Sequence, residues 1–248
     1  MRILISNDDG YQAKGIKQLA ESLSEIAEII IVAPNGNKSA ASSSLTIGKP
    51  LEPIQINNNV FAIDATPSDC VHLALCGFLK EPIDLVVTGI NAGANLGDDV
   101  IYSGTVAGAI EGRFLGLPSI AISLASWKCQ HFETAAIIAK RLVEKIEKAP
   151  LSHKTIINVN VPDVPIEEIK GIKSTRLGNR HRSEPSIQDQ KNPSLYWIGE
   201  NGPEADNGEG TDFYAIANNF VSVTPLQIDL TKYSEIKQVS EWLEDLDY

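Results

Sequence analysis

The chain opens with MRILISNDDG, residues 1–10, in which a short apolar run is followed by a cluster of turn-forming residues. Arg2–Ser6 is rich in branched aliphatic side chains, and Asn7–Gly10 favours a loop, so the pattern predicts a buried strand that ends in a tight turn. In an open α/β sheet, ligands bind at the carboxyl ends of the strands. The sequence therefore predicts that Asp8 and Asp9 lie side by side at that edge.

Two adjacent carboxylates repel each other, and either a cation or a shared proton has to compensate their charge. Oxygen ligands in such a place suit a hard cation such as Mg²⁺ or Mn²⁺. The simpler interpretation of Asp8-Asp9-Gly10 is a solvated turn. Its position directly after a first strand favours the ligand site.

Strands and helices alternate as far as residue 162. An amphipathic helix over Lys14–Ala27 and a buried strand over Glu28–Ala33 complete a first β-α-β unit. The later predicted elements are a hairpin of Leu51–Ile56 and Val60–Ile63, a helix from Thr66 to about Leu79, strands at Ile83–Thr88, Ser119–Leu124 and Thr155–Val161, and helices from about Ser103 and over Phe132–Lys148. This alternation predicts an α/β fold with a doubly wound, mainly parallel sheet.

The pattern changes after residue 162, so we divide the chain into an α/β catalytic core, residues 1–162, and a C-terminal extension, residues 163–248. The extension is expected to complete the core and to form the oligomer interface. Its predicted elements are strands at Gly171–Leu177, Ser194–Gly199 and Phe220–Leu226, an acidic loop over Asn201–Gly210, and a final helix over Glu235–Leu246.

The amino-acid composition argues against several classes of protein, namely those that bind nucleic acid polymers, span membranes or are secreted. The formal net charge of −11 argues against a nucleic acid polymer as partner, because phosphate backbones require clustered Lys and Arg. No apolar run approaches the roughly 18 residues of a membrane span, and the N-terminus carries no secretion signal, which together predict a cytoplasmic protein without membrane contact. Cys70, Cys76 and Cys129 form no CxxC pair, so we interpret them as buried thiols in a reducing compartment.

An acidic chain that binds phosphate has to do so locally, through a metal, backbone amides or a helix N-terminus. The Gly- and Asn-rich stretch Gly89–Asp99 follows a buried strand, and Asn91 and Asn95 offer amide groups to a metal or a phosphate. Ser103-Gly104-Thr105 begins a helix, whose free N–H groups favour an anion. An ordinary Asx-rich turn and a plain N-cap at Ser103 are the alternatives.

Two further stretches complete the candidate residues. Ser39 lies in the small, polar loop after the second strand, at the same predicted edge as Asp8, and no nearby His or Asp completes a Ser-His-Asp triad. A stripe of glycines on the helix after residue 103 is predicted to pack closely against the sheet: Gly104, Gly108, Gly112 and Gly116.

Several motifs occur in a fixed order along the chain. They are Asn7-Asp8-Asp9-Gly10, Ala33-Pro34 with Asn37-Lys38-Ser39, Thr66-Pro67-Ser68-Asp69-Cys70-Val71, Gly89–Asn95, Asp98–Val106, Asn158-Val159-Asn160-Val161-Pro162, Thr175-Arg176-Leu177-Gly178 and Ser222-Val223-Thr224-Pro225-Leu226. Together they resemble the SurE family, the stationary-phase survival proteins that act as 5′/3′-nucleotidases. The resemblance covers essentially the whole chain, and the Asp98–Val106 block is its most specific part.

The resemblance implies a Rossmann-like core and one divalent metal ion, Mg²⁺ or Mn²⁺, in each subunit. The implied metal ligands are Asp8, Asp9, Ser39 and Asn91. The implied phosphate-binding residues are Asn95, Ser103, Gly104 and Thr105. The residues expected to take part in catalysis are Asp8, Asp9 and Asn95. The chain departs from the family at Asn35–Ala40, where the family places an arginine-containing loop before the serine.

The implied function is metal-dependent hydrolysis of nucleoside 5′- and 3′-monophosphates to nucleoside and phosphate, with short polyphosphate as a further substrate. The implied assembly is a homodimer or homotetramer whose subunits exchange C-terminal elements. Two alternatives stay open. A phosphatase with Asp8 as covalent nucleophile needs a positioned Lys, which the sequence does not offer in the expected place. A non-catalytic nucleotide-binding regulator gains nothing from the paired carboxylates of Asp8 and Asp9.

Overall fold

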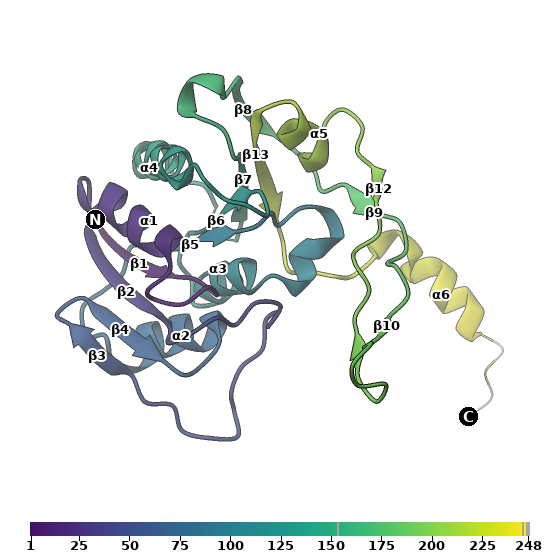
Figure 1. Cartoon of the computed structure of the whole chain (residues 1–248), viewed down its shortest axis with the longest axis horizontal. Helices are drawn as coiled ribbons and strands as arrows, with labels where there is room; N and C mark the ends of the chain where they lie inside the picture. The colour runs from purple at the N-terminus through teal and green to yellow at the C-terminus, as the bar shows by residue number, and fades with distance from the viewer. Residues whose placement is uncertain (153, 245, 247–248) are drawn as a thin grey trace.

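A nine-stranded, mostly parallel sheet runs through the computed structural model, which describes residues 1–152, 154–244 and 246 (Figure 1). The order across the sheet is β3-β4-β2-β1-β5-β6-β7-β13-β8, with β3 and β13 antiparallel to their neighbours β4 and β7. The strands of this sheet are β1 (Arg2–Ser6), β2 (Glu28–Pro34), β3 (Ile54–Asn57), β4 (Val60–Ile63), β5 (Leu85–Ala92), β6 (Ser119–Ala125), β7 (Ile156–Pro162), β8 (Gly171–Ser174) and β13 (Phe220–Leu226).

Helices cover both faces of the sheet, as expected for a doubly wound fold (Figure 1). On one face lie α1 (Lys14–Ser24) and α4 (Phe132–Lys148), which pack on a core that includes Ile3, Ile5 and Leu19. On the other lie α2 (Pro67–Leu73) and α3 (Gly104–Phe114). The predicted Rossmann-like architecture is confirmed.

Most predicted elements of residues 1–162 are confirmed. The helix over Phe132–Lys148 has the predicted bounds, and the hairpin forms from β3 and β4. The helix predicted from Thr66 begins with a capping box between Thr66 and Asp69 and continues as a π-helix over Ala74–Phe78. The Gly- and Asn-rich stretch Gly89–Asp99 does not begin directly after the strand, because β5 extends to residue 92, and it ends inside a 3₁₀ helix, η2, which spans Gly97–Tyr102.

The extension differs more from the prediction. Its first predicted strand is only β8, and its second pairs as the two-residue β11 (Tyr196–Trp197) with β10 (Ile187–Gln188). The acidic loop contains β12 (Glu204–Asp206), which pairs with β9 (Asn179–Arg180). Besides β9, β10 and β12, the prediction also missed the helix α5 (Asp212–Ala217) and the short 3₁₀ helices η3 (Ile166–Glu168) and η4 (Tyr233–Glu235).

The final helix, α6 (Ile236–Leu243), is shorter than the predicted Glu235–Leu246, of which residue 245 lies outside the described residues. In Figure 1, α6 and the β10 hairpin extend away from the sheet and its covering helices. None of the helices in the described residues has the length and apolar character needed to cross a membrane.

The glycine stripe of α3 packs against the sheet at two of its four positions. A Cβ at Gly108 would lie 2.8 Å from Cγ2 of Thr88, and one at Gly112 would lie 2.6 Å from Oγ of Ser119. Gly104 instead faces Asp8, and Gly116 lies beyond the helix in a turn with φ of +88°. Close packing is therefore confirmed for the middle of the stripe and wrong for Gly116.

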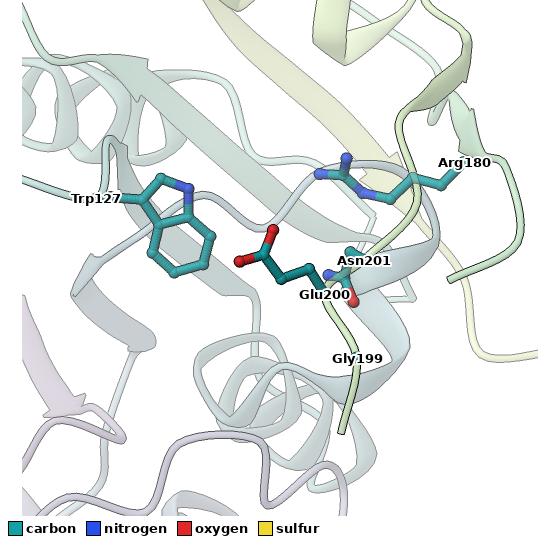
Figure 2. Close-up of a pocket in the computed structure, with 5 residues that line it drawn as sticks. All are labelled: Trp127, Arg180, Gly199, Glu200 and Asn201. Atoms are coloured by element: carbon teal, nitrogen blue, oxygen red, sulfur yellow. The ribbon is translucent and has the colours of Figure 1, made fainter. Parts of the chain in front are cut away.

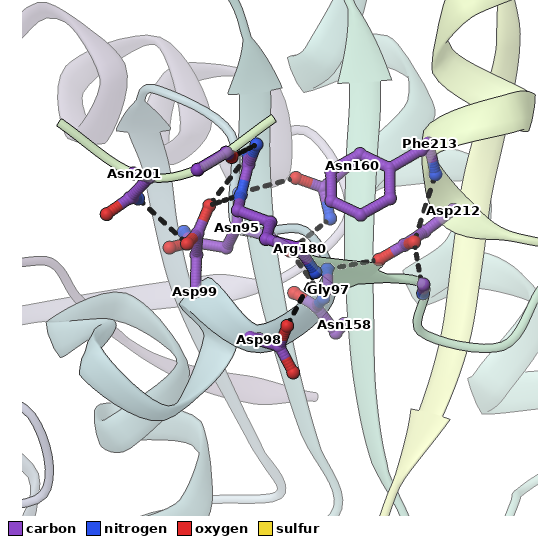
Figure 3. A network of polar contacts seen from close by, with 12 residues as sticks. Asn95, Gly97, Asp98, Asp99, Asn158, Asn160, Arg180, Asn201, Asp212 and Phe213 are labelled. Atoms are coloured by element: carbon purple, nitrogen blue, oxygen red, sulfur yellow. Dashed lines mark hydrogen bonds and ion pairs between the residues drawn. The ribbon is translucent and has the colours of Figure 1, made fainter. Parts of the chain in front are cut away.

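Asp212 joins the extension to the loop after β5. Its carboxylate is fully buried and accepts three backbone N–H groups, from Gly97 at 2.7 Å, Gly178 at 2.8 Å and Phe213 at 2.9 Å (Figure 3). Burial raises the pKa of Asp212, while the hydrogen bonds from Gly97, Gly178 and Phe213 lower it and only partly offset burial. One side chain thus holds three chain segments together.

Replacing Gly112 by valine is expected to lower the free energy of unfolding by about 1–3 kcal/mol, because the side chain overlaps Val86 and Ser119. Gly48→Val is the control, since a Cβ at Gly48 meets open space. Urea unfolding followed by circular dichroism measures both variants. Equal midpoints for the two would contradict close packing at this position.

Asp212→Ala is expected to lower the free energy of unfolding by at least about 2 kcal/mol, because it leaves three buried N–H groups without their acceptor. Asp206→Ala is the matched control, since it removes a partly exposed ion pair with Arg176, a contact worth about 0–1 kcal/mol at a protein surface. The same urea titration compares them, and a loss no larger than that of the control would contradict the role of Asp212.

Candidate active site

The order of the strands reverses at β1 and β5. From β1 the chain builds β2 and β4 on one side, and then returns to place β5, β6 and β7 on the other. At such a switch point the carboxyl ends of parallel strands border a crevice that binds ligands. Asp8 and Asp9 follow one residue after the end of β1, and Asn91 is the second-last residue of β5, so the sheet brings all three to one edge.

A cavity of about 230 Å³ opens at this edge. The predicted site residues that line it are Asp8, Asp9, Ser39, Asn91, Asn95 and Ser103. Two other predicted residues, Gly104 and Thr105, lie behind it against Asp8. The lining residues that the sequence did not single out are Asp99, Tyr102 and Trp127, with small residues between them.

The turn after β1 is fixed by its own side chains. Asn7 donates from Nδ2 to the carbonyl of Gly10 and accepts from its N–H through Oδ1, so the two carboxylates project from a closed loop. Gly10 has a φ of +101°, which favours glycine. The N–H of Lys38 donates to the carbonyl of Asp8 at 2.7 Å, which brings the Ser39 loop to the same edge.

Asp8 is held from the opposite side by α3. The Thr105 hydroxyl donates to Oδ1 of Asp8 at 2.5 Å, and Asp8 is only 5% exposed. Burial raises the pKa of Asp8, and the Asp9 carboxylate raises it further, against the lowering effect of the Thr105 hydrogen bond. This position therefore favours the arrival of a positive charge.

Asp9 is more open than Asp8. Its Oδ2 accepts the N–H of Ala92 at 3.1 Å, which ties the carboxylate to the end of β5. Burial raises the pKa of Asp9, against this hydrogen bond. No Lys, Arg or His in the described part of the chain forms an ion pair with Asp8 or Asp9.

Asn95 is fixed by two asparagines of β7 (Figure 3). Its N–H donates to Oδ1 of Asn160, its carbonyl accepts from Nδ2 of both Asn158 and Asn160, and its own Nδ2 donates to Oγ of Ser123. Ser123, Asn158 and Asn160 are not among the predicted site residues. Asn158 and Asn160 stand two apart in an apolar strand, a spacing that puts both on one face and signals a buried polar network.

Asp99 and Arg180 connect the cavity to the extension. Arg180 contacts Asp99 through Nε at 2.9 Å and Nη2 at 2.8 Å, and Asn201 donates to the same carboxylate (Figure 3). Lys38, next to Ser39 in sequence, forms its ion pair with Asp64 and does not line the cavity. The position of Asp99 in the cavity wall thus depends on Arg180, which lies 81 residues further along the chain.

The first turn of α3 lies beside the carboxylates. Ser103 is its N-cap, and its hydroxyl accepts the N–H of Val106 at 3.0 Å. The N–H groups of Gly104 and Thr105 belong to the turn whose donors have no acceptor inside the helix. The arrangement sets an anion-binding helix end next to a pair of carboxylates that favour a cation.

Comparison with known proteins gives a consistent result. The family model described as "Survival protein SurE" matches residues 3–184. A protein of Ruthia magnifica named 5′-nucleotidase SurE is 74% identical over 99% of this chain and 100% of its own length. A protein of the same name from Alkalilimnicola ehrlichii is 54% identical over 99% of this chain and 96% of its own length.

A solved structure agrees with these matches. The crystal structure of the SurE protein from Aquifex aeolicus superposes with a TM-score of 0.88 at 41% identity, covering 99% of this chain and 100% of that one. The matches extend over the sheet, the cavity and the extension. The chain therefore belongs to the SurE family.

Proposed function

We propose that this protein is a metal-dependent phosphomonoesterase that hydrolyses nucleoside 5′-monophosphates. The observation that carries the proposal is one cavity in which two carboxylates, a hydroxyl and an amide meet beside the first turn of α3. The relatives named 5′-nucleotidase support the same activity. Hydrolysis of 3′-monophosphates and short polyphosphate, a cytoplasmic location and the division at residue 162 remain predictions.

The donor set fits a hard divalent cation. Four side chains can offer oxygen donors to a cation in the cavity, those of Asp8, Asp9, Ser39 and Asn91. The Asn91 amide has Oδ1 available for this, because its Nδ2 already donates to the carbonyl of Gly93. Among the described residues, no cluster of three or more His, Cys, Asp or Glu side chains can hold a metal. The set therefore favours Mg²⁺ or Mn²⁺ over zinc.

When bound there, a divalent cation supplies positive charge to the phosphoryl oxygens and acidifies water. The protein's own residues bind the phosphate and orient the carboxylates. The free N–H groups of Gly104 and Thr105, with Ser103 and Asn95, hold phosphoryl oxygens as charge redistributes in the transition state. Thr105 also fixes the Asp8 carboxylate through its hydroxyl.

Asp9 suits the role of general base. It lines the cavity and is more exposed than Asp8, so a water molecule in the cavity can approach its carboxylate. Asp8 is already engaged by Thr105. Asp8 and Asp9 both belong to the donor set for the cation, and Asp9 is the one of the pair that is also placed to receive a proton.

The extension supports a homodimer or homotetramer. The side chains on one stripe of α6 are apolar and 41–74% exposed, namely Ile236, Val239, Trp242 and Leu243. An isolated helix of this kind needs a partner surface to bury its apolar face. We propose that a second copy of the chain covers it, with exchange of C-terminal elements between subunits.

The activity is tested by phosphate release from a panel of nucleoside 5′- and 3′-monophosphates, first with EDTA and then with Mg²⁺ or Mn²⁺ restored. Hydrolysis of the 5′-monophosphates is expected to vanish with EDTA and to return with metal, because the paired carboxylates otherwise repel the phosphate. Undiminished turnover in EDTA would contradict the metal, and no turnover under any metal would contradict the enzyme.

Asp8→Asn is expected to lower kcat/KM by at least about 100-fold and to weaken Mn²⁺ binding in calorimetry, because it removes a carboxylate from the proposed metal site. The apo variant should unfold at the same temperature or higher, since the buried charge at Asp8 is relieved. Asp189→Asn, at a half-buried position outside the cavity, is the matched control. Wild-type turnover in Asp8→Asn would exclude the proposed role.

Trp242→Glu is expected to lower the molecular mass measured by light scattering after gel filtration, because it places a charge in the apolar stripe of α6. Gln238→Glu introduces the same charge at an exposed polar position of the same helix and should leave the mass unchanged. A monomeric wild type, or equal masses for both variants, would contradict the proposed assembly.

A further inference from the structure

A second and larger cavity lies beside the active site. It measures about 630 Å³ and is lined by Trp127, Arg180, Gly199, Glu200 and Asn201 (Figure 2). Trp127 lines both this cavity and the one that contains Asp8 and Asp9. The volume is within the range of pockets that enclose small organic ligands. The two cavities therefore meet at one indole ring.

A network of hydrogen bonds also connects the walls of the two cavities. Asp99 lines the first cavity, and its carboxylate accepts hydrogen bonds from Arg180 and Asn201, which line the second. Arg180 further donates to the carbonyl of Gly202 at 3.2 Å. These contacts fix the extension next to the sheet edge, so the second cavity borders the first.

Trp127 is an exposed aromatic side chain on an anchored loop. It is 98% exposed, and the backbone around it is held by hydrogen bonds: Ser126 accepts the N–H of Lys128, and Asp163 accepts the N–H groups of Gln130 and His131. A solvent-exposed indole on such a loop offers a flat face on which a nucleobase can stack.

Glu200 supplies the polar recognition. Figure 2 shows its carboxylate between the Trp127 indole and the Arg180 guanidinium. Arg180 forms its ion pair with Asp99, and within the described residues Glu200 has no ion-pair partner. A carboxylate accepts hydrogen bonds and donates none, so it favours a base edge that carries an amino group.

We infer that the second cavity binds the base of the nucleotide substrate, with Trp127 stacking on its face and Glu200 accepting a hydrogen bond from its exocyclic amino group. The inference rests on the proposed function, because it assigns the second part of the same substrate. It predicts a preference for adenosine 5′-monophosphate over inosine 5′-monophosphate, which carries an oxygen in place of the amino group.

The test measures kcat and KM for adenosine 5′-monophosphate, inosine 5′-monophosphate and ribose 5-phosphate, a phosphomonoester without a base. Trp127→Ala is expected to raise KM for adenosine 5′-monophosphate about tenfold and to raise KM for ribose 5-phosphate by a much smaller factor. Trp127→Phe should retain most of the affinity. Gln130→Ala, an exposed neighbour that does not line the cavity, should behave as wild type.

Glu200→Gln separates base recognition from stacking. It is expected to reduce the ratio of kcat/KM for adenosine over inosine 5′-monophosphate about tenfold toward unity, because the glutamine amide offers both a donor and an acceptor. Ribose 5-phosphate should be hydrolysed at the wild-type rate. An unchanged ratio would overturn the role of Glu200.

The outcomes distinguish this subsite from the proposed activity. If Trp127→Ala leaves KM for adenosine 5′-monophosphate unchanged while hydrolysis persists, the subsite is wrong and the phosphomonoesterase stands. If no phosphate is released from any substrate, the proposed function fails. Calorimetric binding of adenosine 5′-monophosphate to the wild type and to Trp127→Ala then still decides the subsite, since equal affinities would overturn it.

Discussion

The hydrogen bond from the Thr105 hydroxyl to the Asp8 carboxylate, 2.5 Å long, joins the end of β1 to the first turn of α3. The approach is so close that a Cβ at Gly104 would lie 2.8 Å from Cβ of Asp8, so glycine is required there. A helix end that favours anions and a carboxylate that favours cations thereby become neighbours. The proposed chemistry depends on that distance, because a phosphate has to meet both at once.

The sheet and its covering helices could be predicted from the sequence because their residues repeat with the periods of strands and helices. Runs of apolar residues such as Ile29–Val32 predict a buried strand, and these residues are buried in the structure. The capping residues of α2 and α3 mark where these helices begin. The position of Asp8 and Asp9 followed from the topology of an α/β sheet. Local sequence and the rule that ligands bind at the carboxyl ends of strands were enough to place these two residues.

The remaining features depend on contacts between distant segments. Strands of two residues, such as β11, and the six-residue α5 are too short for any period to be visible. In the sequence, nothing distinguishes Asp212 from other acidic residues, because its role depends on Gly97, which lies close to it only in the folded chain. The partners of Asn95 on β7 could be suspected from alternating asparagines, but their target was not visible in the sequence.

The bond between Asp212 and Gly97 joins positions 115 residues apart. A ribosome delivers the chain from its N-terminus at roughly 5–20 residues per second, so several seconds separate synthesis of the two partners. During that interval the strands from β1 to β7 have emerged, while the backbone around Asn95 still lacks a contact supplied by the last third of the polypeptide. Chains that end before Asp212 therefore lack the acceptor that holds this loop, and the surroundings of Asn95 are complete only after the last third of the polypeptide has been synthesised.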